Sequence, residues 1–198
     1  MRSFFIIISI LLLSGCSVTK PSMTEYRINL DNSSVNLGAD GCIDKSIKIS
    51  QAFSKITMMT KDMSYAQGID KQFVYSQSQW SIDPNHAITS EILKLLRDTK
   101  LFKSVQSSKS RSISDWVMEI NIEDFMQYFN EGSTSSHVNV VISLAIIDSK
   151  TKRIISSDTF GSKVEASTLD AGGGVKALNI ALLNTLLESK EWLAKVCK

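Results

Sequence analysis

Residues 116–148 read WVMEINIEDFMQYFNEGSTSSHVNVVISLAIID, and this stretch decides the fold. Apolar side chains alternate with polar ones before and after the polar turn at 132–136. A period of two predicts strands that bury one face and leave the other in solvent. A second polar turn at 148–152 leads to a third strand over 154–164, so we expect an antiparallel meander of three strands.

Two helices flank this meander in the sequence. The first begins at Asp83-Pro84, where Asp suits the N-cap and Pro the first helical position, and its apolar residues keep helical spacing up to Asp98. The second follows the glycines 172–174, a flexible lead-in, and runs from about 175 to 195. The sequence predicts an α+β fold, an antiparallel sheet with mixed edges and two helices packed on one face.

The chain before and between these elements is less regular. Most of 52–79 is expected to be irregular edge structure, and short strands are predicted at 46–50 and 71–76. Residues 26–30 could form a first strand or an arm. After the first helix a short strand runs through Val105. Residues 104–114 are rich in serine and basic residues and are expected to form an exposed hairpin loop.

The composition excludes several classes of protein. The 198 residues carry 22 Lys and Arg against 20 Asp and Glu, and a net charge of +2 gives no general field for attracting nucleic acid. His86 and His137 are the two histidines, and neither lies in a metalloprotease motif. The sequence has no nucleophile elbow and no P-loop. We therefore expect no enzymatic activity, no metal site and no cofactor.

The first sixteen residues read MRSFFIIISILLLSGC and look like a lipoprotein signal peptide. The apolar run would cover roughly 15 Å as a helix, about half the hydrocarbon thickness, so it is too short to span a membrane. Leu13-Ser14-Gly15-Cys16 resembles the lipobox of bacterial lipoproteins, in which the cysteine sulfur is acylated. The alternative is an ordinary secretory signal with a chance cysteine. We expect a signal peptide over 1–15, a lipidated tether over 16–25 and one periplasmic domain over 26–198.

Cys42 and Cys197 are the cysteines that remain after Cys16. In an oxidising compartment they would form a disulfide that closes a loop of about 155 residues. The alternative is two independent thiols. The sequence contains no CxxC motif, which disfavours a redox active site.

Two groups of residues are candidate contacts for a partner or a lipid. Met58, Met59 and Met63 could fill the core, bind Cu(I), or form a pliable apolar surface, of which Met58 and Met59 are the candidate residues. Phe73, Tyr75 and Trp80 bracket a polar stretch and could anchor an interface. The alternative for Trp80 is that it fastens the following helix to the sheet.

The order of these features resembles the ABC-type transport auxiliary lipoproteins, the PqiC-like family. The resemblance covers nearly the whole chain after the signal peptide, and the segments that carry it are Cys16, 26–30, 73–75, Trp80, Leu93, Leu96, 102–105, 116–125, 138–148, 154–160 and 192–193. The poorly matching stretch at 50–70 and the Cys42 and Cys197 pair depart from it.

The resemblance implies a role outside catalysis, in lipid trafficking between two membranes. It implies a domain related to the N-terminal domain of TolB, anchored through Cys16 in the outer membrane and facing the periplasm. Its partners would be an Mce-domain protein and the permease and ATPase of an ABC transporter, and phospholipid is a further candidate ligand. Ser17 fits sorting to the outer membrane.

Two other roles stay open at this point. One is a lipoprotein that activates a cell-wall synthase, which would need a long tether, whereas about ten residues separate Cys16 from the first predicted strand. The other is a direct lipid carrier, which would need an apolar cavity of several hundred Å³.

Overall fold

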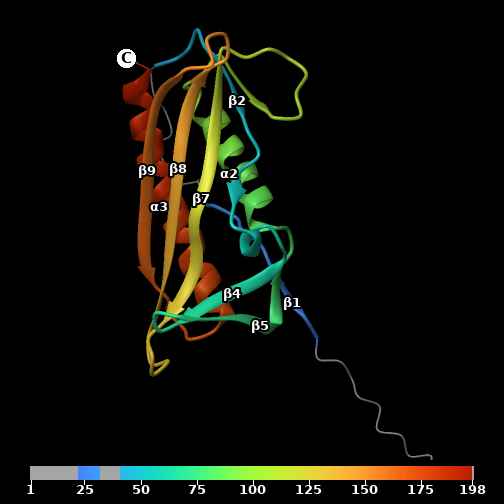
Figure 1. Ribbon diagram of the computed structural model, residues 1–198, viewed down its shortest axis with the longest axis vertical. Helices are drawn as coiled ribbons and strands as arrows, with labels where there is room; N and C mark the ends of the chain where they lie inside the picture. The colour runs from blue at the N-terminus through green and yellow to red at the C-terminus, as the bar shows by residue number, and fades with distance from the viewer. Residues whose placement is uncertain (1–21, 32–40, 198) are drawn as a thin grey trace, which may run out of the picture.

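The computed structural model describes residues 22–31 and 41–197, so the predicted signal peptide and Cys16 lie outside the described residues (Figure 1). The elements are β1 (Thr24–Tyr26), β2 (Ser46–Ile49), β3 (Phe53–Ser54), the 3-10 helix η1 (Ile56–Met58), β4 (Asp62–Gln67), β5 (Lys71–Trp80), α2 (Pro84–Thr99), β6 (Ser104–Ser107), β7 (Trp116–Phe129), β8 (Ser136–Asp148), β9 (Ile154–Glu165) and α3 (Ala171–Val196). Together they form the predicted α+β fold.

The predicted meander is confirmed as β7, β8 and β9, which pair antiparallel in chain order. A register shift between Ile122 and Asp124 interrupts β7. Before the shift the even-numbered residues of β7 are buried, and after it the odd-numbered residues Phe125, Gln127 and Phe129 are buried. A bulge of this kind moves every later side chain to the opposite face. It therefore brings a glutamine into the core.

The other side of β7 is parallel, and three short strands share it. β2 pairs with the start of β7, β3 with its middle and β4 with its end. β6 lies outside β2 and is also parallel to it. The predicted hairpin loop at 104–114 is therefore wrong, because β2 lies between β6 and β7. The chain after β6 instead crosses from the end of one strand to the start of another.

The predicted irregular stretch at 52–79 contains more strand than expected. β4 and β5 form an antiparallel hairpin, and β5 runs to Trp80 rather than ending at 76. Of the strand or arm expected at 26–30, the structure has the arm, since β1 covers Thr24–Tyr26, pairs with β5 and ends before 27. Ile28 and Leu30 are buried without being in a strand, and the amide of Asn29 donates to Asn179 Oδ1 of α3 at 3.1 Å.

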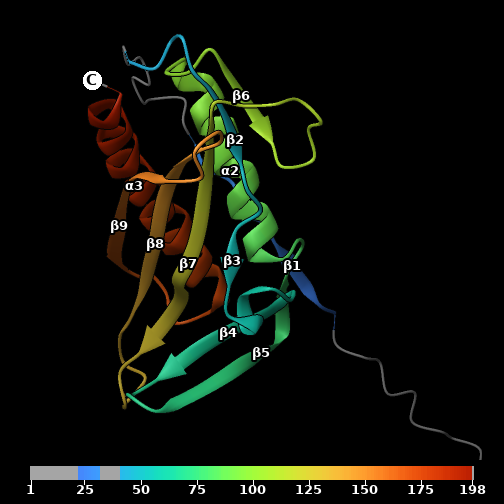
Figure 2. The same ribbon diagram turned by 45° about the horizontal axis from the view of Figure 1, so that its top comes forward.

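Both helices lie on the same face of the sheet (Figures 1 and 2). α2 matches its predicted limits, and its apolar residues join those of α3 and the inner sheet face in one core. α3 packs across β8 and β9. It begins earlier than predicted, because the three glycines form its first turn rather than a flexible lead-in. No helix among the described residues is long and apolar enough to cross a bilayer.

The long axis of the molecule has two different ends (Figure 1). The hairpin end holds the β4–β5 turn at 68–70, the end of β7 and the start of α3. The disulfide end holds the bond between Cys42 and Cys197, together with the start of β7 and the turn between β8 and β9. The 14 residues of β7 separate the two ends by about 43 Å at the usual rise of a strand.

Candidate functional site

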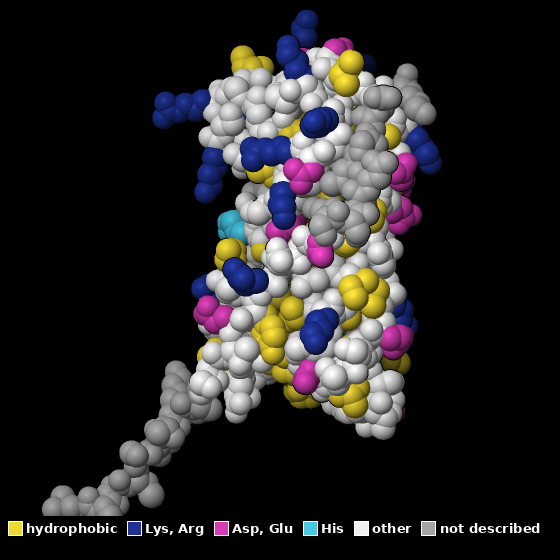
Figure 3. Space-filling model, turned by 180° about the vertical axis from the view of Figure 1, so that it is seen from behind, with side chains coloured by type: hydrophobic (Ala, Val, Ile, Leu, Met, Phe, Trp, Pro, Cys, Tyr) yellow, Lys and Arg dark blue, Asp and Glu magenta, His cyan; other side chains and the backbone are white. Residues whose placement is uncertain are grey.

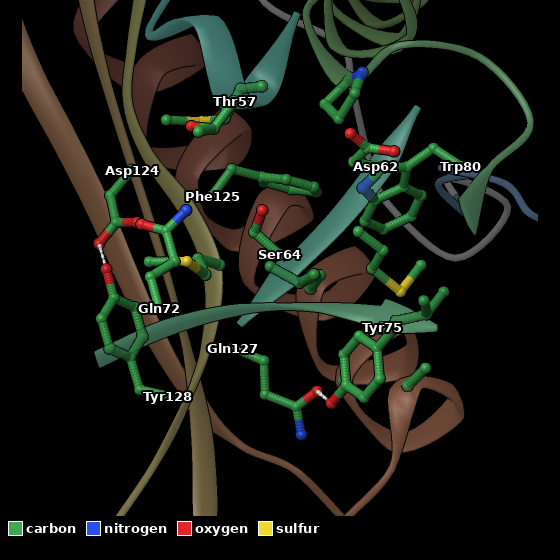
Figure 4. A pocket seen from close by; sticks show the side chains of 18 of the residues that line it. Thr57, Asp62, Ser64, Gln72, Tyr75, Trp80, Asp124, Phe125, Gln127 and Tyr128 are labelled. Carbon is green, nitrogen blue, oxygen red and sulfur yellow. Dashed lines mark hydrogen bonds between the residues drawn. The ribbon is translucent and has the colours of Figure 1, made fainter. Parts of the chain in front are cut away.

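A cavity of about 140 Å³ lies between the β4–β5 hairpin, β7 and the first turn of α3 (Figure 4). Its apolar wall comes from η1, the sheet and α3 and includes Met58, Met63, Trp80, Phe125, Val175 and Leu178. Its polar wall includes Thr57, Asp62, Ser64, Gln72, Tyr75, Asp124, Gln127 and Tyr128. The bulge in β7 positions this wall, since it turns Phe125 and Gln127 toward the helices.

Gln127 is the polar centre of the cavity. Its side chain is 3% exposed, its Oε1 accepts from the Tyr75 hydroxyl at 2.9 Å, and its Nε2 donates to Ser136 Oγ at 2.9 Å. A side chain on Gly174 would collide with the Gln127 amide, so a glycine is needed there for α3 to approach β7. Burial, with the nearby charges of Tyr65 and Asp170, raises the pKa of Tyr75 above its ordinary value.

A second hydrogen-bonded group lies on the other side of β7. The Tyr128 hydroxyl donates to Asp124 Oδ2 at 2.7 Å, and Asn139 Nδ2 donates to the same oxygen at 2.8 Å. Burial and the bond to Asp124 raise the pKa of Tyr128. The Tyr128 ring stacks on His137 with centroids 5.5 Å apart, and burial together with Lys163 lowers the pKa of His137. The Asp124 carboxylate thus accepts two hydrogen bonds from neighbouring side chains.

The structure separates the residues that the sequence proposed as contacts. Met58, Tyr75 and Trp80 line the cavity, whereas Phe73 and Met59 do not. Trp80 is 3% exposed and packs on Phe125 of β7 with ring centroids 5.7 Å apart, so it is a core residue. It offers no surface contact.

Phe73 and Met59 are each 41% exposed. The Phe73 ring stacks on Tyr65 of the same hairpin, with ring centroids 5.4 Å apart. Met59 borders a surface groove with Phe53 and Ile56. Met63 is a core residue at 3% exposed. Met58 and Met63 therefore share the cavity wall, and Met59 lies apart on the surface.

Sequence reasoning missed Gln127 and Gly174. A strict alternation through β7 would place Gln127 in solvent, and the bulge that buries it leaves only a faint trace in the sequence. That trace is the three-residue step from Ile122 to Phe125 where a two-residue step is expected. Glycines before a helix usually read as a linker, and their packing role appears only with the sheet in place.

The cavity is too small to enclose a lipid. Sites for drug-sized ligands measure about 300–1,000 Å³, whereas this one measures about 140 Å³. Larger hollows of about 790 and 760 Å³ are open grooves on the sheet face that carries no helix. One lies along β7, β8 and β9, and the other lies between β7 and the segment 53–59. No cluster of residues suited to a metal ion occurs in 22–31 or 41–197. The cavity of about 140 Å³ therefore does not meet the requirement of the direct-carrier role.

A groove of about 450 Å³ lies at the disulfide end, between Lys45, Ile113, Trp116 and Lys150. Ile113 is 93% exposed. Further basic and apolar residues adjoin it in the neighbouring turns, namely Ile43, Lys103, Lys152, Arg153 and Ile154.

The two aspartates of this groove are turned toward the protein. Asp115 Oδ2 accepts from the Ser46 hydroxyl at 2.6 Å and from its amide at 2.8 Å. Asp148 Oδ1 accepts from the amides of Lys150 and Thr151 at 3.0 and 2.6 Å. The hydrogen bonds that Ser46 donates to Asp115 lower the pKa of that carboxyl, and those from Thr151 lower the pKa of Asp148. Both aspartates therefore stay ionised, and the groove itself carries two lysines and two carboxylates.

Comparison with known proteins gives structural neighbours only. Neither a family model nor a curated relative matches the sequence. A Xanthomonas campestris protein of the DUF330 family aligns over 87% of this chain and 96% of its own, with 14% identity and a TM-score of 0.73. An uncharacterized protein aligns over 88% and 97%, with 10% identity and a TM-score of 0.63. A Chlamydia trachomatis protein aligns over 77% and 98%, with 8% identity and a TM-score of 0.50. The likeness shows the fold of DUF330, the PqiC-like family.

Proposed function

We propose that this chain is a lipid-anchored periplasmic auxiliary component of an ABC-type, Mce-associated system that moves lipid between membranes. The observation that carries the proposal is the alignment of 87% of the chain with a DUF330 structure at a TM-score of 0.73. The lipobox-like sequence ending at Cys16 supports the anchor. In this role the protein is not an enzyme. It docks the end of a periplasmic bridge at the outer membrane.

The position of β1 supports an orientation of the domain relative to the anchor. Thr24 lies eight positions after Cys16, and even fully extended this segment spans at most about 26–29 Å. β1 pairs with β5, so this short tether leaves the domain from the strands of the hairpin end. The disulfide end, about 43 Å away along β7, would then face the periplasm.

The groove at the disulfide end is the docking surface that we assign to the bridge protein. Its exposed isoleucines offer apolar contact area, while the adjoining Lys103, Lys152 and Arg153 favour an acidic surface on the partner. Asp115 and Asp148 balance the two lysines that line the groove, so the basic character of this end comes from the neighbouring Lys103, Lys152 and Arg153.

The test is site-specific photo-crosslinking in cells that make the acylated protein. A photoreactive amino acid replaces Ile113 in one variant and Ile69, an equally exposed residue of the hairpin end, in a matched control. Capture of an Mce-domain protein from position 113 but not from 69 is the expected result. Capture of a peptidoglycan synthase without an Mce-domain protein would reject the proposal in favour of the cell-wall activator.

The anchor is tested separately. Cys16→Ala, placed behind an ordinary secretory signal peptide in place of residues 1–15, should release the protein into the soluble periplasmic fraction. The unchanged chain should stay in the outer-membrane fraction. Equal membrane association of the two proteins would show that acylation at Cys16 is not the anchor.

A further inference from the structure

The β4–β5 hairpin carries apolar side chains that are exposed to solvent and lie outside the core. Ile69, at the tip of the turn, is fully exposed, and Phe73 and Val74 on β5 are 41% and 52% exposed. Gly68 has φ +65°, which the tight turn requires, and its amide donates to the Phe129 carbonyl at 3.1 Å. The turn is thereby fixed to the end of β7, so Ile69 is held in a defined place.

Further apolar residues lie near the hairpin. Met23, just before β1, and Leu169, just before α3, are 45% and 49% exposed. On the face shown in Figure 3, hydrophobic side chains form their larger areas toward the hairpin end, whereas Lys and Arg gather toward the disulfide end. The aromatic rings of Tyr65 and Phe73 stack on this hairpin. The ring of a tyrosine such as Tyr65 carries a polar hydroxyl, and such rings favour the boundary between water and lipid.

The length of the tether identifies what covers this surface. If Cys16 is acylated, its sulfur lies at the bilayer surface, and Thr24 lies within about 26–29 Å of it. Thr24 pairs with Ser78 of β5, the strand that also carries Phe73. The bilayer that holds the anchor is therefore the nearest large apolar phase to the hairpin.

We propose that the β4–β5 hairpin, through Ile69 and Phe73, contacts the phospholipid bilayer in which the chain is anchored. This rests on the lipid anchor of the proposed function. The hairpin is a second, weaker membrane contact that stops the domain from rotating freely on its tether. It keeps the disulfide end directed away from the membrane, so that the groove at this end meets a partner in one orientation.

The test uses tryptophan as a reporter in the full-length acylated protein, purified in detergent and reconstituted into vesicles. The vesicles contain phosphatidylethanolamine and phosphatidylglycerol with brominated or ordinary acyl chains. The reporters are Ile69→Trp and Phe73→Trp, and Ile113→Trp is the matched control because Ile113 is 93% exposed at the other end. Trp80, Trp116 and Trp192 are present in every variant, so differences between variants arise from the added residue.

Brominated chains are expected to lower the fluorescence added at positions 69 and 73 by about twofold, since interfacial side chains sit roughly 5–10 Å into the boundary of headgroups and acyl chains. The fluorescence added at position 113 should not change. Equal quenching at 69 and 113, or none at either in protein that floats with the vesicles, would overturn the hairpin contact while leaving the anchor intact. Acylated protein that fails to float would instead reject the anchor, and the hairpin contact with it.

Discussion

Cys42 and Cys197 are bonded to each other although 155 positions separate them, and their Cα atoms lie 5.0 Å apart. The bond ties the segment before β2 to the residue that follows α3, so it closes the domain at the end opposite the hairpin. The chain passes close to itself here, because a Cβ on Gly41 would lie 2.7 Å from Cys197 Cβ. Of the two alternatives that the sequence left open, the structure has the disulfide.

Removing this bond should destabilise the fold. The double variant Cys42→Ser and Cys197→Ser is expected to lower the free energy of unfolding by about 2–4 kcal/mol, since the unfolded chain regains the entropy of a long open loop. Urea denaturation followed by circular dichroism measures the difference. Reductant should shift the wild-type midpoint and leave that of the double variant unchanged. An unchanged midpoint in the variant would contradict a structural role for the bond.

Gly173→Ala should also destabilise the protein, although Ala ordinarily favours a helix over Gly by about 1 kcal/mol. A Cβ at this position would collide with the Thr168 hydroxyl and carbonyl and lie 2.8 Å from the Thr168 amide nitrogen. Overpacking against backbone should cost about 1–3 kcal/mol. Gly132→Ala is the control, because its Cβ would meet only Thr134 at 3.8 Å. Thermal unfolding of both variants gives the comparison, and a more stable Gly173→Ala protein would refute the packing role.

The two helix N-caps should respond differently to the same substitution. Asp170 Oδ1 accepts from the Gly173 amide at 2.7 Å, whereas the Asp83 side chain makes no capping hydrogen bond. Asp170→Ala is therefore expected to cost about 1 kcal/mol, and Asp83→Ala clearly less. Urea denaturation at neutral pH resolves the two values. Equal losses would mean that the observed bond to Gly173 does not stabilise α3.

Tyr75 should make the protein less stable in alkali. Burial raises its pKa in the folded state, so the folded protein keeps a proton that the unfolded chain releases above about pH 10. This contribution is complete below that pH and is lost as the pH rises toward the folded pKa.

Tyr75→Phe is expected to weaken the alkaline decline in stability. It should also cost about 1 kcal/mol at neutral pH, because Gln127 Oε1 loses its donor. Urea unfolding of both proteins between about pH 8 and about pH 11 gives the two slopes. Identical slopes would exclude Tyr75 as a source of the pH dependence.

The parts of the fold that the sequence predicted well depend on local contacts. Each strand of the meander carries its own alternation, and short polar turns leave neighbouring strands little choice of partner. α2 has Pro84 at its start and a regular apolar face, so its limits are encoded within the helix itself. The lipobox-like sequence is local in the same sense, and Cys16 remains a prediction outside the described residues.

The missed features all depend on distant residues. β4 became a strand because the end of β7 is available to pair with it, and its own sequence, DMSYAQ, has little strand character. Nothing in the sequence of 104–114 indicated that β2 lies between β6 and β7. Of the proposed contact residues, Trp80 proved to be buried because β5 extends further than its alternation indicated.

Sequence alone determined the fold class, the meander and the first helix, because side-chain period and turn chemistry act over a few residues. Tertiary structure decided which strands run parallel to β7, where the bulge turns Gln127 inward, and why α3 begins with glycines. It also placed Ile69 and Ile113 at opposite ends of the molecule. These features arise when segments far apart in the chain compete for the same edge or the same space, and no local pattern records the outcome of that competition.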